Sequence, residues 1–233
     1  MRALLLSAGL GTRLRPITNN IPKCLVPING APLLQIWIER LTAAGIGPFL
    51  VNTHYLADKV TAFVEESTFR KKIQVTFEEE LLGTAGTLIR NLDFFQGEDG
   101  LLIHADNYCL ADFTVFERAH NNRPLGCLMT MMTFRTDDPS SCGIVEVDES
   151  GVVVGFHEKV EHPPGNLANG AIYIISQELL EIIKTDLNYI TDFSTEVLHQ
   201  FKGYIFSHEI SDVFLDVGTP DRYEKANNLK VEI

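Results

Sequence analysis

The sequence lacks the excess of positive charge that binding to nucleic acid requires. Its 19 Lys and Arg residues stand against 31 Asp and Glu residues, which gives a formal net charge of −12 over 233 residues. No basic stripe is available to neutralise a run of phosphates, so we expect no nucleic acid partner. An acidic chain can still bind a small anion where its few basic residues converge on one site. The position of each Arg and Lys is therefore informative.

The sequence also lacks paired cysteines and long apolar runs. Four scattered cysteines form no Cys-x-x-Cys pair and no metal-like spacing, which indicates reduced thiols in a reducing compartment. The apolar start of the chain stops at Gly9 and is followed at once by Arg13 and Arg15, so it is too short for a signal peptide. No stretch approaches the ~18 apolar residues that span a bilayer. We expect a cytoplasmic protein with no membrane partner.

What the sequence does contain is an alternation of short apolar runs with helix-like segments. This alternation predicts βαβ units and a mostly parallel sheet, which is an α/β fold. The predicted strands lie at residues 3–6, 49–53, 73–77 and 100–104. The predicted helices lie at residues 33–44, 57–66, 84–92 and 113–120.

From about Cys127 the pattern changes to β-rich segments. The runs 127–134, 143–147 and 152–156 are typical of strands, and residues 148–151 form a strong hairpin turn. No linker, internal repeat or low-complexity tract separates this part from the first. We therefore expect a single domain, residues 1–233, with an antiparallel extension of a parallel sheet.

A glycine-rich turn follows the first strand. Gly9 and Gly11 suit a loop whose backbone N–H groups approach phosphates closely. Arg13 can form paired hydrogen bonds with phosphate oxygens, and Lys23 supplies a second positive charge. The turn is not a Walker A loop, and Leu14 occupies the third glycine position of a dinucleotide fingerprint. The combination favours a phosphate-binding loop.

Two later segments place small or acidic residues at the ends of elements. Gly83, Thr84 and Ala85 stand at the start of a helix, where backbone N–H groups can read the edge of a base. The alternative is an ordinary N-cap at Thr84. Asp106 ends a buried strand, and such strand ends face the ligand crevice in parallel α/β sheets. Asp106 is therefore a candidate Mg²⁺ ligand, with a helix cap or turn as the alternative.

The β-rich half carries polar residues that suit a phosphorylated sugar. Lys159 can neutralise a sugar phosphate, and Glu158 and Asn169 can form hydrogen bonds with sugar hydroxyls. Taken by itself, a Glu-Lys pair on a β-hairpin is more often a solvated surface.

Together these motifs resemble the sugar-1-phosphate nucleotidylyltransferases, and the mannose-1-phosphate and manno-heptose-1-phosphate guanylyltransferase branch in particular. The segments that carry the resemblance are 7–16 with Pro22-Lys23, 82–86, Glu158-Lys159, Asn169-Gly170 and 214–220. They span nearly the whole chain. Phe214 replaces the family's Trp, Val160 replaces its Pro, and we assign no chemistry to His104.

The resemblance implies a Rossmann-like nucleotidyltransferase fold similar to that of GT-A enzymes. A nucleotide-binding part would cover about residues 1–125 and a sugar-phosphate-binding part about 126–233, with no C-terminal hexapeptide-repeat domain. The implied reaction joins a nucleoside triphosphate to a sugar 1-phosphate and releases pyrophosphate, with Mg²⁺ as cofactor. GTP and mannose- or manno-heptose-1-phosphate are the expected substrates.

The resemblance also implies a role for individual residues. The expected catalytic residues are Arg13, Lys23, Asp106 and Asp216, the last two as Mg²⁺ ligands. The expected nucleotide-binding residues are Ser7, Ala8, Gly9, Gly11, Thr12, Arg13, Lys23, Gly83, Thr84 and Ala85. The expected sugar-phosphate-binding residues are Gly143, Glu158, Lys159 and Asn169.

Several alternatives stay open at this point. Uridylyl, cytidylyl and thymidylyl transfer share the same phosphate chemistry. A metal-dependent glycosyltransferase would use similar strand-end carboxylates, although it would not need the glycine-rich triphosphate loop. A non-catalytic nucleotide-sugar-binding subunit is a third reading. The sequence does not fix the oligomeric state, and a homo-oligomer remains among the options.

Overall fold

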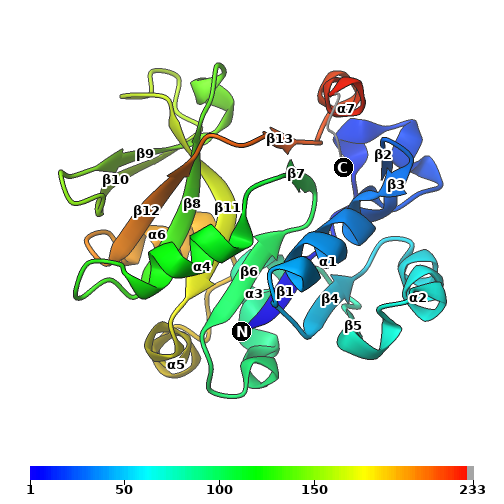
Figure 1. Ribbon diagram of the computed structural model, residues 1–233, viewed down its shortest axis with the longest axis horizontal. Coiled ribbons are helices and arrows are strands. Elements are labelled where there is room, and N and C mark those ends of the chain that lie inside the picture. The colour runs from blue at the N-terminus through cyan, green and yellow to red at the C-terminus, as the bar shows by residue number, and fades with distance from the viewer. Residues whose placement is uncertain (230–233) are drawn as a thin grey trace. The chain divides into compact units, whose positions relative to one another are not determined.

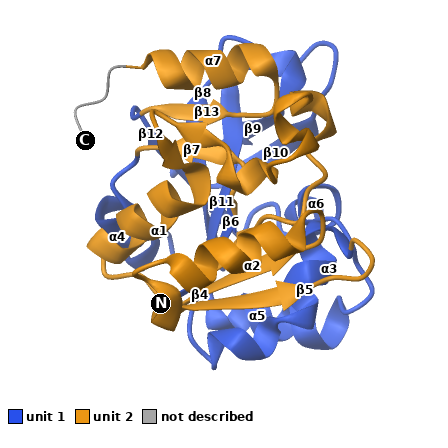
Figure 2. Ribbon diagram, turned by 90° about the vertical axis from the view of Figure 1, so that its right-hand side faces the viewer, with its two compact units in different colours: residues 1–2, 82–103, 111–212 blue, residues 3–81, 104–110, 213–233 orange. Residues whose placement is uncertain are grey.

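The structure is a computed structural model, and it describes residues 1–229. The last four residues of the predicted domain 1–233 lie outside the described residues. The chain forms two compact units that interleave along the sequence and are coloured separately in Figure 2. Unit 1 comprises residues 1–2, 82–103 and 111–212, and unit 2 comprises residues 3–81, 104–110 and 213 onward.

Unit 2 is built on parallel strands. In Figure 1 these are β1 (Arg2–Leu6), β4 (Phe49–Thr53) and β5 (Ile73–Phe77). Leu4 pairs with Leu50, and Leu50 pairs with Gln74. Every residue of β4 is buried, which is the pattern of a strand covered on both faces. The helices of this unit are α1 (Leu33–Ala43), α2 (Ala57–Glu66) and α7 (Pro220–Asn228).

Two short antiparallel pairs and four 3-10 turns complete unit 2. The pairs are β2 (Pro27–Ile28) with β3 (Ala31–Pro32), and β7 (Asn107–Cys109) with β13 (Phe214–Asp216). The turns are η1 (Thr12–Leu14), η2 (Ile17–Asn19), η3 (Lys23–Leu25) and η4 (Arg70–Lys72). The pairing of β7 with β13 joins chain segments about 100 residues apart; Asp216 ends β13, and Asp106 immediately precedes β7.

Helix α1 shows why this part of the sequence folds as it does. Its buried side chains recur at helical spacing: Leu33, Leu34, Trp37, Ile38 and Leu41. The helix ends where Gly45 adopts a left-handed φ of +76°, and the N–H of Ile46 bonds back to the Leu41 carbonyl. Trp37 is 1% exposed and donates its ring N–H to the Asn107 carbonyl at 2.9 Å. The helix thereby fixes the strand β7 that follows Asp106.

Unit 1 has a mixed arrangement of strands. They are β6 (Gly100–His104, whose last residue belongs to unit 2), β8 (Met129–Arg135), β9 (Gly143–Val147), β10 (Val153–Glu158), β11 (Leu167–Ile175) and β12 (Ile205–Ile210). β11 pairs antiparallel with β6, β8 and β9, and β9 pairs antiparallel with β10. β12 runs parallel to β8. The antiparallel pairing agrees with the β-rich character predicted for the second half of the sequence.

Two helices of unit 1, α4 (Phe113–Asn121) and α5 (Gln177–Asp186), have clear start signals. The other helices of this unit are α3 (Gly83–Arg90) and α6 (Leu198–Gln200), with η5 (Leu92–Phe95), η6 (Pro139–Ser141) and the π-helical turn η7 (Phe193–Val197). Asp112 caps α4 by accepting from the N–H groups of Thr114 and Val115, and Ser176 caps α5. In the β9–β10 turn, the Asp148 carboxylate accepts from the N–H groups of Ser150 and Val152.

The α/β fold class predicted from the sequence is confirmed, with parallel strands in the first part and antiparallel strands in the second. The predicted strands at 49–53, 73–77, 100–104 and 143–147 have the observed bounds. In the described residues, no helix is both long and apolar enough to cross a membrane. The single-domain assignment, with its division near residue 125, stays a prediction.

Candidate functional site

The predicted phosphate loop follows β1 and depends on one glycine. Gly11 has a left-handed φ of +62°, and a Cβ added there would lie 3.0 Å from the Thr18 methyl group. Thr18 is buried and donates its hydroxyl to the Gly11 carbonyl at 2.7 Å. Leu14 is fully buried, whereas Thr12 and Arg13 are exposed. A larger residue at position 11 would therefore disturb the turn that presents these two side chains.

A buried polar network fixes the start of the loop. The N–H of Ser7 donates to the Asn52 side-chain oxygen at 2.7 Å, and the Ser7 hydroxyl donates to the Asn52 carbonyl at 2.5 Å. Asn52 in turn donates to Glu78 at 2.9 Å. Burial raises the pKa of the neighbouring Cys24 thiol to about 12, against a hydrogen bond with Ser7 that lowers it. Ser7 therefore holds the loop in place through its own hydrogen bonds.

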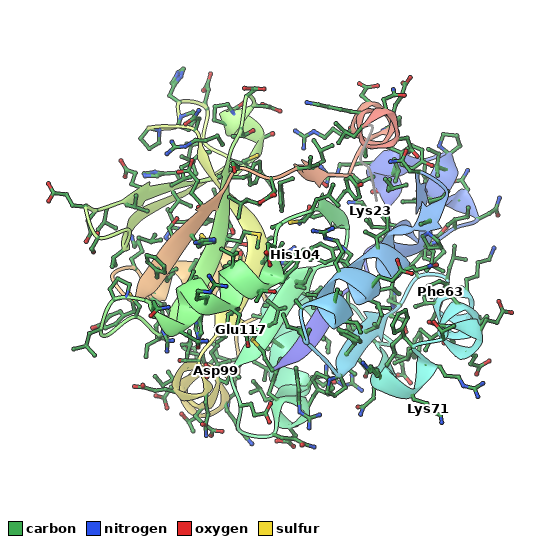
Figure 3. All side chains as sticks on the ribbon, in the orientation of Figure 1. Lys23, Phe63, Lys71, Asp99, His104 and Glu117 are labelled. Atoms are coloured by element: carbon green, nitrogen blue, oxygen red, sulfur yellow. The ribbon has the colours of Figure 1, made fainter. Side chains whose placement is uncertain are left out.

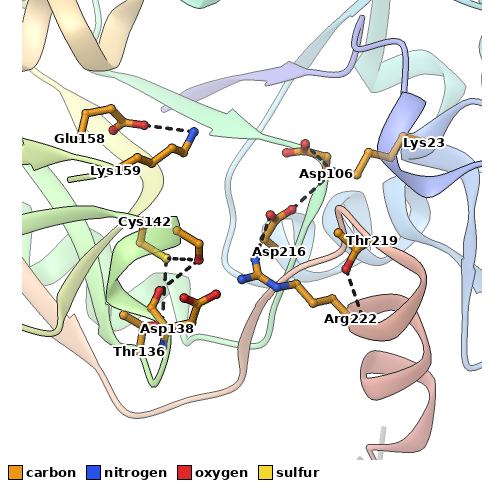
Figure 4. Close-up of polar contacts among 11 residues, drawn as sticks. Lys23, Asp106, Thr136, Asp138, Cys142, Glu158, Lys159, Asp216, Thr219 and Arg222 are labelled. Atoms are coloured by element: carbon orange, nitrogen blue, oxygen red, sulfur yellow. Dashed lines mark hydrogen bonds and ion pairs between the residues drawn. The ribbon is translucent and has the colours of Figure 1, made fainter. Parts of the chain in front are cut away.

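Lys23 lies between two carboxylates that are distant in the sequence. Its Nζ is 2.6 Å from Asp106 Oδ2 and 3.4 Å from Asp216 Oδ1, as Figure 4 shows. The Lys23 side chain is 8% exposed, and the carboxylates are 40% and 31% exposed. The Ala105 N–H bonds to the Leu6 carbonyl, and β13 pairs with β7, which brings both aspartates to the end of β1. The structure thus brings the predicted catalytic residues Lys23, Asp106 and Asp216 into direct contact.

The charge state of Asp106 follows from its neighbours. Burial alone would raise the pKa of its carboxyl group, but the charges of Lys23 and His104 and the hydrogen bond from Lys23 outweigh that effect. The pKa of Asp106 is lowered as a result, so the carboxylate is ionised at neutral pH. His104, to which the sequence analysis assigned no chemistry, therefore acts on Asp106 electrostatically.

Arg13 and Arg222 both approach Asp216. Arg222 Nη1 lies 3.2 Å from Asp216 Oδ2 (Figure 4). A Cβ added to Gly218 would lie 3.2 Å from Arg13 Nη2 and 2.8 Å from Asp216 Oδ1, so Arg13 reaches the same corner as the aspartate. Sequence analysis missed Arg222. The sequence feature that could have revealed it is Thr219-Pro220 after Asp216, which is typical of a helix start. Thr219 caps α7, and Arg222 in the first turn of that helix lies near Asp216.

The donor chemistry of this corner suits a hard cation. Asp106 and Asp216 offer carboxylate oxygens, and Mg²⁺ is commonly held by one or two carboxylates together with substrate phosphates. Within residues 1–229, no group of three or more His, Cys, Asp or Glu side chains is placed to hold a metal ion. Two carboxylates that leave the remaining coordination positions to a substrate and water fit Mg²⁺ better than a closed zinc site.

The predicted base-reading segment lies in unit 1, at the start of α3. Gly83 has φ +78°, and a Cβ there would come within 2.4 Å of the Thr191 carbonyl oxygen. The N–H groups of Ala85 and Gly86 donate to that same oxygen at 2.9 and 3.3 Å. The expectation that this helix start leaves its N–H groups for a base is therefore wrong for these two residues. The N–H of Thr191 itself is held by Glu196 at 2.8 Å.

Thr84 links helix α3 to the segment around Phe193 and does not cap the helix. It lies inside α3, and no side chain caps the helix. Its hydroxyl accepts from the Phe193 N–H at 2.7 Å and lies 3.4 Å from an Asp192 carboxylate oxygen. The N-cap alternative for Thr84 is therefore excluded. Thr84 ties α3 to the π-helical turn η7, which the sequence analysis did not foresee.

The predicted sugar-phosphate residues also lie in unit 1. Lys159 Nζ is 3.2 Å from Glu158 Oε1, and the Lys159 side chain is 65% exposed (Figure 4). Lys159 has a left-handed φ of +48°, and its N–H donates to the Cys142 carbonyl at 3.2 Å. A Cβ added to Gly143 would lie 2.7 Å from Glu158 Oε2, so Gly143 provides the space for this carboxylate. The geometry therefore groups Gly143, Glu158 and Lys159.

Asn169 is engaged by its own strand. Its amide nitrogen donates to the Tyr173 hydroxyl at 2.7 Å, and its amide oxygen accepts from the Ala171 N–H at 2.8 Å. Between Asn169 and Tyr173 the pairing of β11 with β8 is irregular, and Ala171 has φ +52°. Burial raises the pKa of Tyr173, so its hydroxyl stays protonated. Asn169 thus stabilises a bulge, and its contact with a sugar stays a prediction.

Comparisons with known proteins agree on one family. A family model described as nucleotidyl transferase matches residues 2–232. A putative mannose-1-phosphate guanyltransferase of Sulfolobus acidocaldarius is 29% identical over 97% of this chain and 62% of its own length. The D-glycero-alpha-D-manno-heptose 1-phosphate guanylyltransferase of Campylobacter jejuni is 29% identical over 96% of this chain and 97% of its own length. The chain therefore spans about 62% of some curated relatives and nearly all of another.

Solved structures resemble this chain over its whole length. A putative glucose-1-phosphate thymidylyltransferase from Bacillus anthracis has a TM-score of 0.86 at 22% identity, and the match covers 100% of this chain and 96% of that one. HddC from Yersinia pseudotuberculosis complexed with GMP-PN has a TM-score of 0.81 at 26% identity, with 97% of both chains covered. The first likeness supports the α/β fold class.

Proposed function

The chain belongs to the nucleotidyl transferase family, and we propose that it transfers a nucleotidyl group from a nucleoside triphosphate to a sugar 1-phosphate. A sugar phosphate oxygen forms a bond to the α-phosphorus, the bond from that phosphorus to the bridging oxygen breaks, and pyrophosphate leaves. The protein supplies positioning and charge, so no side chain has to act as a nucleophile.

The observation that carries this proposal is the position of Lys23. Its buried ammonium group contacts both Asp106 and Asp216 and lies next to the loop that Gly11 shapes. Two anionic substrates repel one another, and a like-charge pair ~4 Å apart costs about 1 kcal/mol in water and about 4 kcal/mol at an effective dielectric near 20. Lys23 and Arg13 are the residues proposed to offset that repulsion on the triphosphate.

Asp106 and Asp216 are proposed to hold Mg²⁺, which would supply further positive charge to the phosphates when bound. Both carboxylates already face a cation, Lys23 Nζ, so they are oriented toward a shared point. Arg222 keeps Asp216 in that orientation through its contact at 3.2 Å. The other proposed nucleotide-binding residues come from the loop after β1 and from the start of α3, where the Ala85 N–H is already bonded to Thr191 and a base would have to contact other groups. They are Ser7, Ala8, Gly9, Gly11, Thr12, Gly83, Thr84 and Ala85.

The sugar phosphate is assigned to the exposed cation Lys159. Lys159 forms an ion pair with Glu158 at 3.2 Å, and its 65% exposure leaves the ammonium group accessible to an anion. Glu158 can accept hydrogen bonds from sugar hydroxyls, in the space that Gly143 leaves beside it. The bulge at Asn169 is proposed to support this surface.

Guanosine triphosphate and a manno-configured sugar 1-phosphate are the proposed substrates. The support is the Leu82–Gly86 sequence together with the guanylyl transfer for which the Sulfolobus and Campylobacter relatives are named. The HddC structure was solved with GMP-PN, a guanine nucleotide. Thymidylyl transfer is the second candidate, because the Bacillus anthracis protein of the same fold carries that name.

One panel of reactions tests the function and the substrates separately. Pyrophosphate release is measured with GTP, UTP, CTP, ATP and dTTP at equal concentration, each with mannose 1-phosphate, glucose 1-phosphate and manno-heptose 1-phosphate. We expect GTP with a manno-configured phosphate to react fastest. Release with any pair supports nucleotidyl transfer, and a faster rate with another base rejects only the choice of GTP. No release with any pair, in the presence of Mg²⁺, would reject the proposed reaction.

A further inference from the structure

Strand β5 is an open edge in unit 2. It pairs with β4 along one side, and no other strand of residues 1–229 pairs with its second side. Glu78 N–H donates to the Thr53 carbonyl, and the Thr53 hydroxyl donates to the Thr76 carbonyl, so the even-numbered residues bond toward β4. In a regular strand the odd-numbered residues Ile73, Val75 and Phe77 then direct their backbone groups outward. An open edge of this kind is a template for another strand.

A groove with an apolar floor and a charged margin accompanies this edge, with a volume of about 580 Å³. Its apolar lining is Val64, Ile73 and Val75, and its polar lining is Thr61, Glu65, Arg70 and Lys71. Phe77 is on the same face of the strand, since side chains alternate, and it is 54% exposed. The groove thus lies at one end of this short strand and the exposed Phe77 at the other. A second strand could place its own phenylalanine in the groove.

Charges of opposite sign flank the strand. Arg70 and Lys71 precede it in η4, and Glu79 and Glu80 follow it; all four are exposed. Figure 3 shows Lys71 at the outer margin of unit 2. The segment from residue 70 to residue 80 therefore has a basic start, an apolar middle and an acidic end, with Val75 at its centre. When two such segments lie antiparallel, the basic start of each faces the acidic end of the other.

We propose that two copies of this chain associate through an antiparallel pairing of β5 with β5. A two-fold axis at Val75 places Val75 opposite Val75 and Ile73 opposite Phe77, which are all residues with outward backbone groups. The same axis brings Arg70 and Lys71 of each copy to Glu79 and Glu80 of the other. Phe77 of each copy packs beside Ile73 and Val64 of the other, in the groove described above.

The order of charges along the segment 70–80 favours a second copy of this chain as the strand that pairs with β5. A foreign strand could use the backbone edge equally well, but only a strand with this same order of charges satisfies both flanks at once. A closed two-fold contact also consumes both edges, which prevents continued addition of strands. Parallel addition would place like charges together, and it is disfavoured for that reason.

Charge reversal tests the pairing because the contact is self-complementary. One variant carries Arg70→Glu with Lys71→Glu, and the other carries Glu79→Lys with Glu80→Lys. Sedimentation equilibrium should give twice the chain mass of 26.0 kDa for the natural protein and the single chain mass for each variant. Each variant places four like-charge contacts across the axis, so we expect its dimer dissociation constant to rise about tenfold or more.

Mixing the two charge-reversed variants is the most discriminating test of the proposed pairing. In the mixed dimer both flanks again carry opposite charges, so association should return to near the natural affinity. Lys202→Glu, an exposed reversal in unit 1, is the matched control and should leave the dimer unchanged. Circular dichroism and melting temperature establish that all variants are folded.

Three results would overturn the proposal. The natural protein could stay monomeric at 100-fold above the concentration needed for the assay. Both charge-reversed variants could still dimerise, or the mixture of the two variants could stay monomeric. Phe77→Ser tests the groove without changing any charge, and it should weaken the dimer in the same direction. A dimer that Phe77→Ser leaves intact would place the contact elsewhere.

Discussion

Lys23 and Lys159 show two ways in which one chain prepares a cation for a phosphate. Lys23 is 8% exposed and contacts two carboxylates, so its position is set before any substrate arrives. Lys159 is 65% exposed, has Glu158 as its carboxylate partner and itself has a left-handed φ. A buried charge needs such partners, because leaving it unpaired is costly, whereas an exposed one is stabilised by water. The comparison teaches that the corner of unit 2 positions its lysine through ion pairs with two carboxylates, whereas the hairpin of unit 1 leaves its lysine exposed to solvent.

Removing one carboxylate should break the corner around Lys23 and give the largest effect. We expect Asp106→Asn and Asp216→Asn each to lower the rate of pyrophosphate release by roughly 10²–10³, as for loss of a preorganised electrostatic group. Mg²⁺ omission with chelator should do the same. Asp212→Asn, an exposed aspartate just before β13, is the control and should keep full activity. Near-normal turnover in either site variant with an unchanged melting temperature would contradict the assignment.

Neutralising each lysine should separate the two substrates. Lys23→Met is expected to raise the KM for the nucleoside triphosphate, and Lys159→Met the KM for the sugar phosphate, each about tenfold or more because a charged hydrogen bond is lost. Titration of one substrate at a saturating level of the other gives both constants. If both variants weakened binding of the same substrate alone, the division of roles between the two lysines would be wrong.

Arg222 tests how far the corner depends on the orientation of Asp216. Arg222→Gln removes the contact that orients Asp216, and we expect kcat to fall roughly three- to tenfold, as for the loss of one partly exposed ion pair. Because Arg222 acts on Asp216, a higher Mg²⁺ concentration should restore part of the activity. Arg222→Lys, which keeps the charge, should lie between the two. Equal losses in the Gln and Lys variants with no response to Mg²⁺ would point to a packing role only.

The smallest effect is expected in the pH dependence of stability. The folded-state pKa of Asp106 is lowered from its usual 3.8, because Lys23 and His104 outweigh the opposing effect of burial. A lowered pKa contributes stability that is fully present above the unfolded-state pKa and is lost as the pH falls through the folded-state pKa. The melting temperature of the natural protein should therefore fall more steeply below pH 4 than that of Asp106→Asn. Parallel curves would show that Asp106 gains no stability from its partners.

Much of the fold and part of the site could be predicted from the sequence. The strand bounds of β4 and β5 follow from short apolar runs bounded by polar residues, because that pattern is local. Asp106 was recognisable because it lies close to the end of a buried strand, although that strand, β6, ends at His104 and not at Asp106 itself. Its meeting with Asp216 rested on the family resemblance, since no local pattern shows that β13 pairs with β7.

The features that sequence reasoning missed depend on how the backbone is bent and where distant segments meet. The Thr191 carbonyl that accepts from the N–H groups of Ala85 and Gly86 comes from a segment more than 100 residues away. Arg222 contacts Asp216 because α7 begins just after β13. Asn169 bonds to Tyr173 in its own strand because β11 is irregular between them. None of these contacts is marked by a residue pattern.

Cys24 shows what a buried position does to chemical durability. It is next to Lys23 in the chain, and burial raises the pKa of its thiol to about 12, so the thiol stays protonated at pH 7. Peroxide and alkylating reagents attack the thiolate, so this cysteine should be passed over while the more exposed Cys142 is labelled. The phosphate corner should accordingly tolerate oxidative stress without a reductant, and a cysteine-reactive inhibitor aimed at Cys24 would find no handle there.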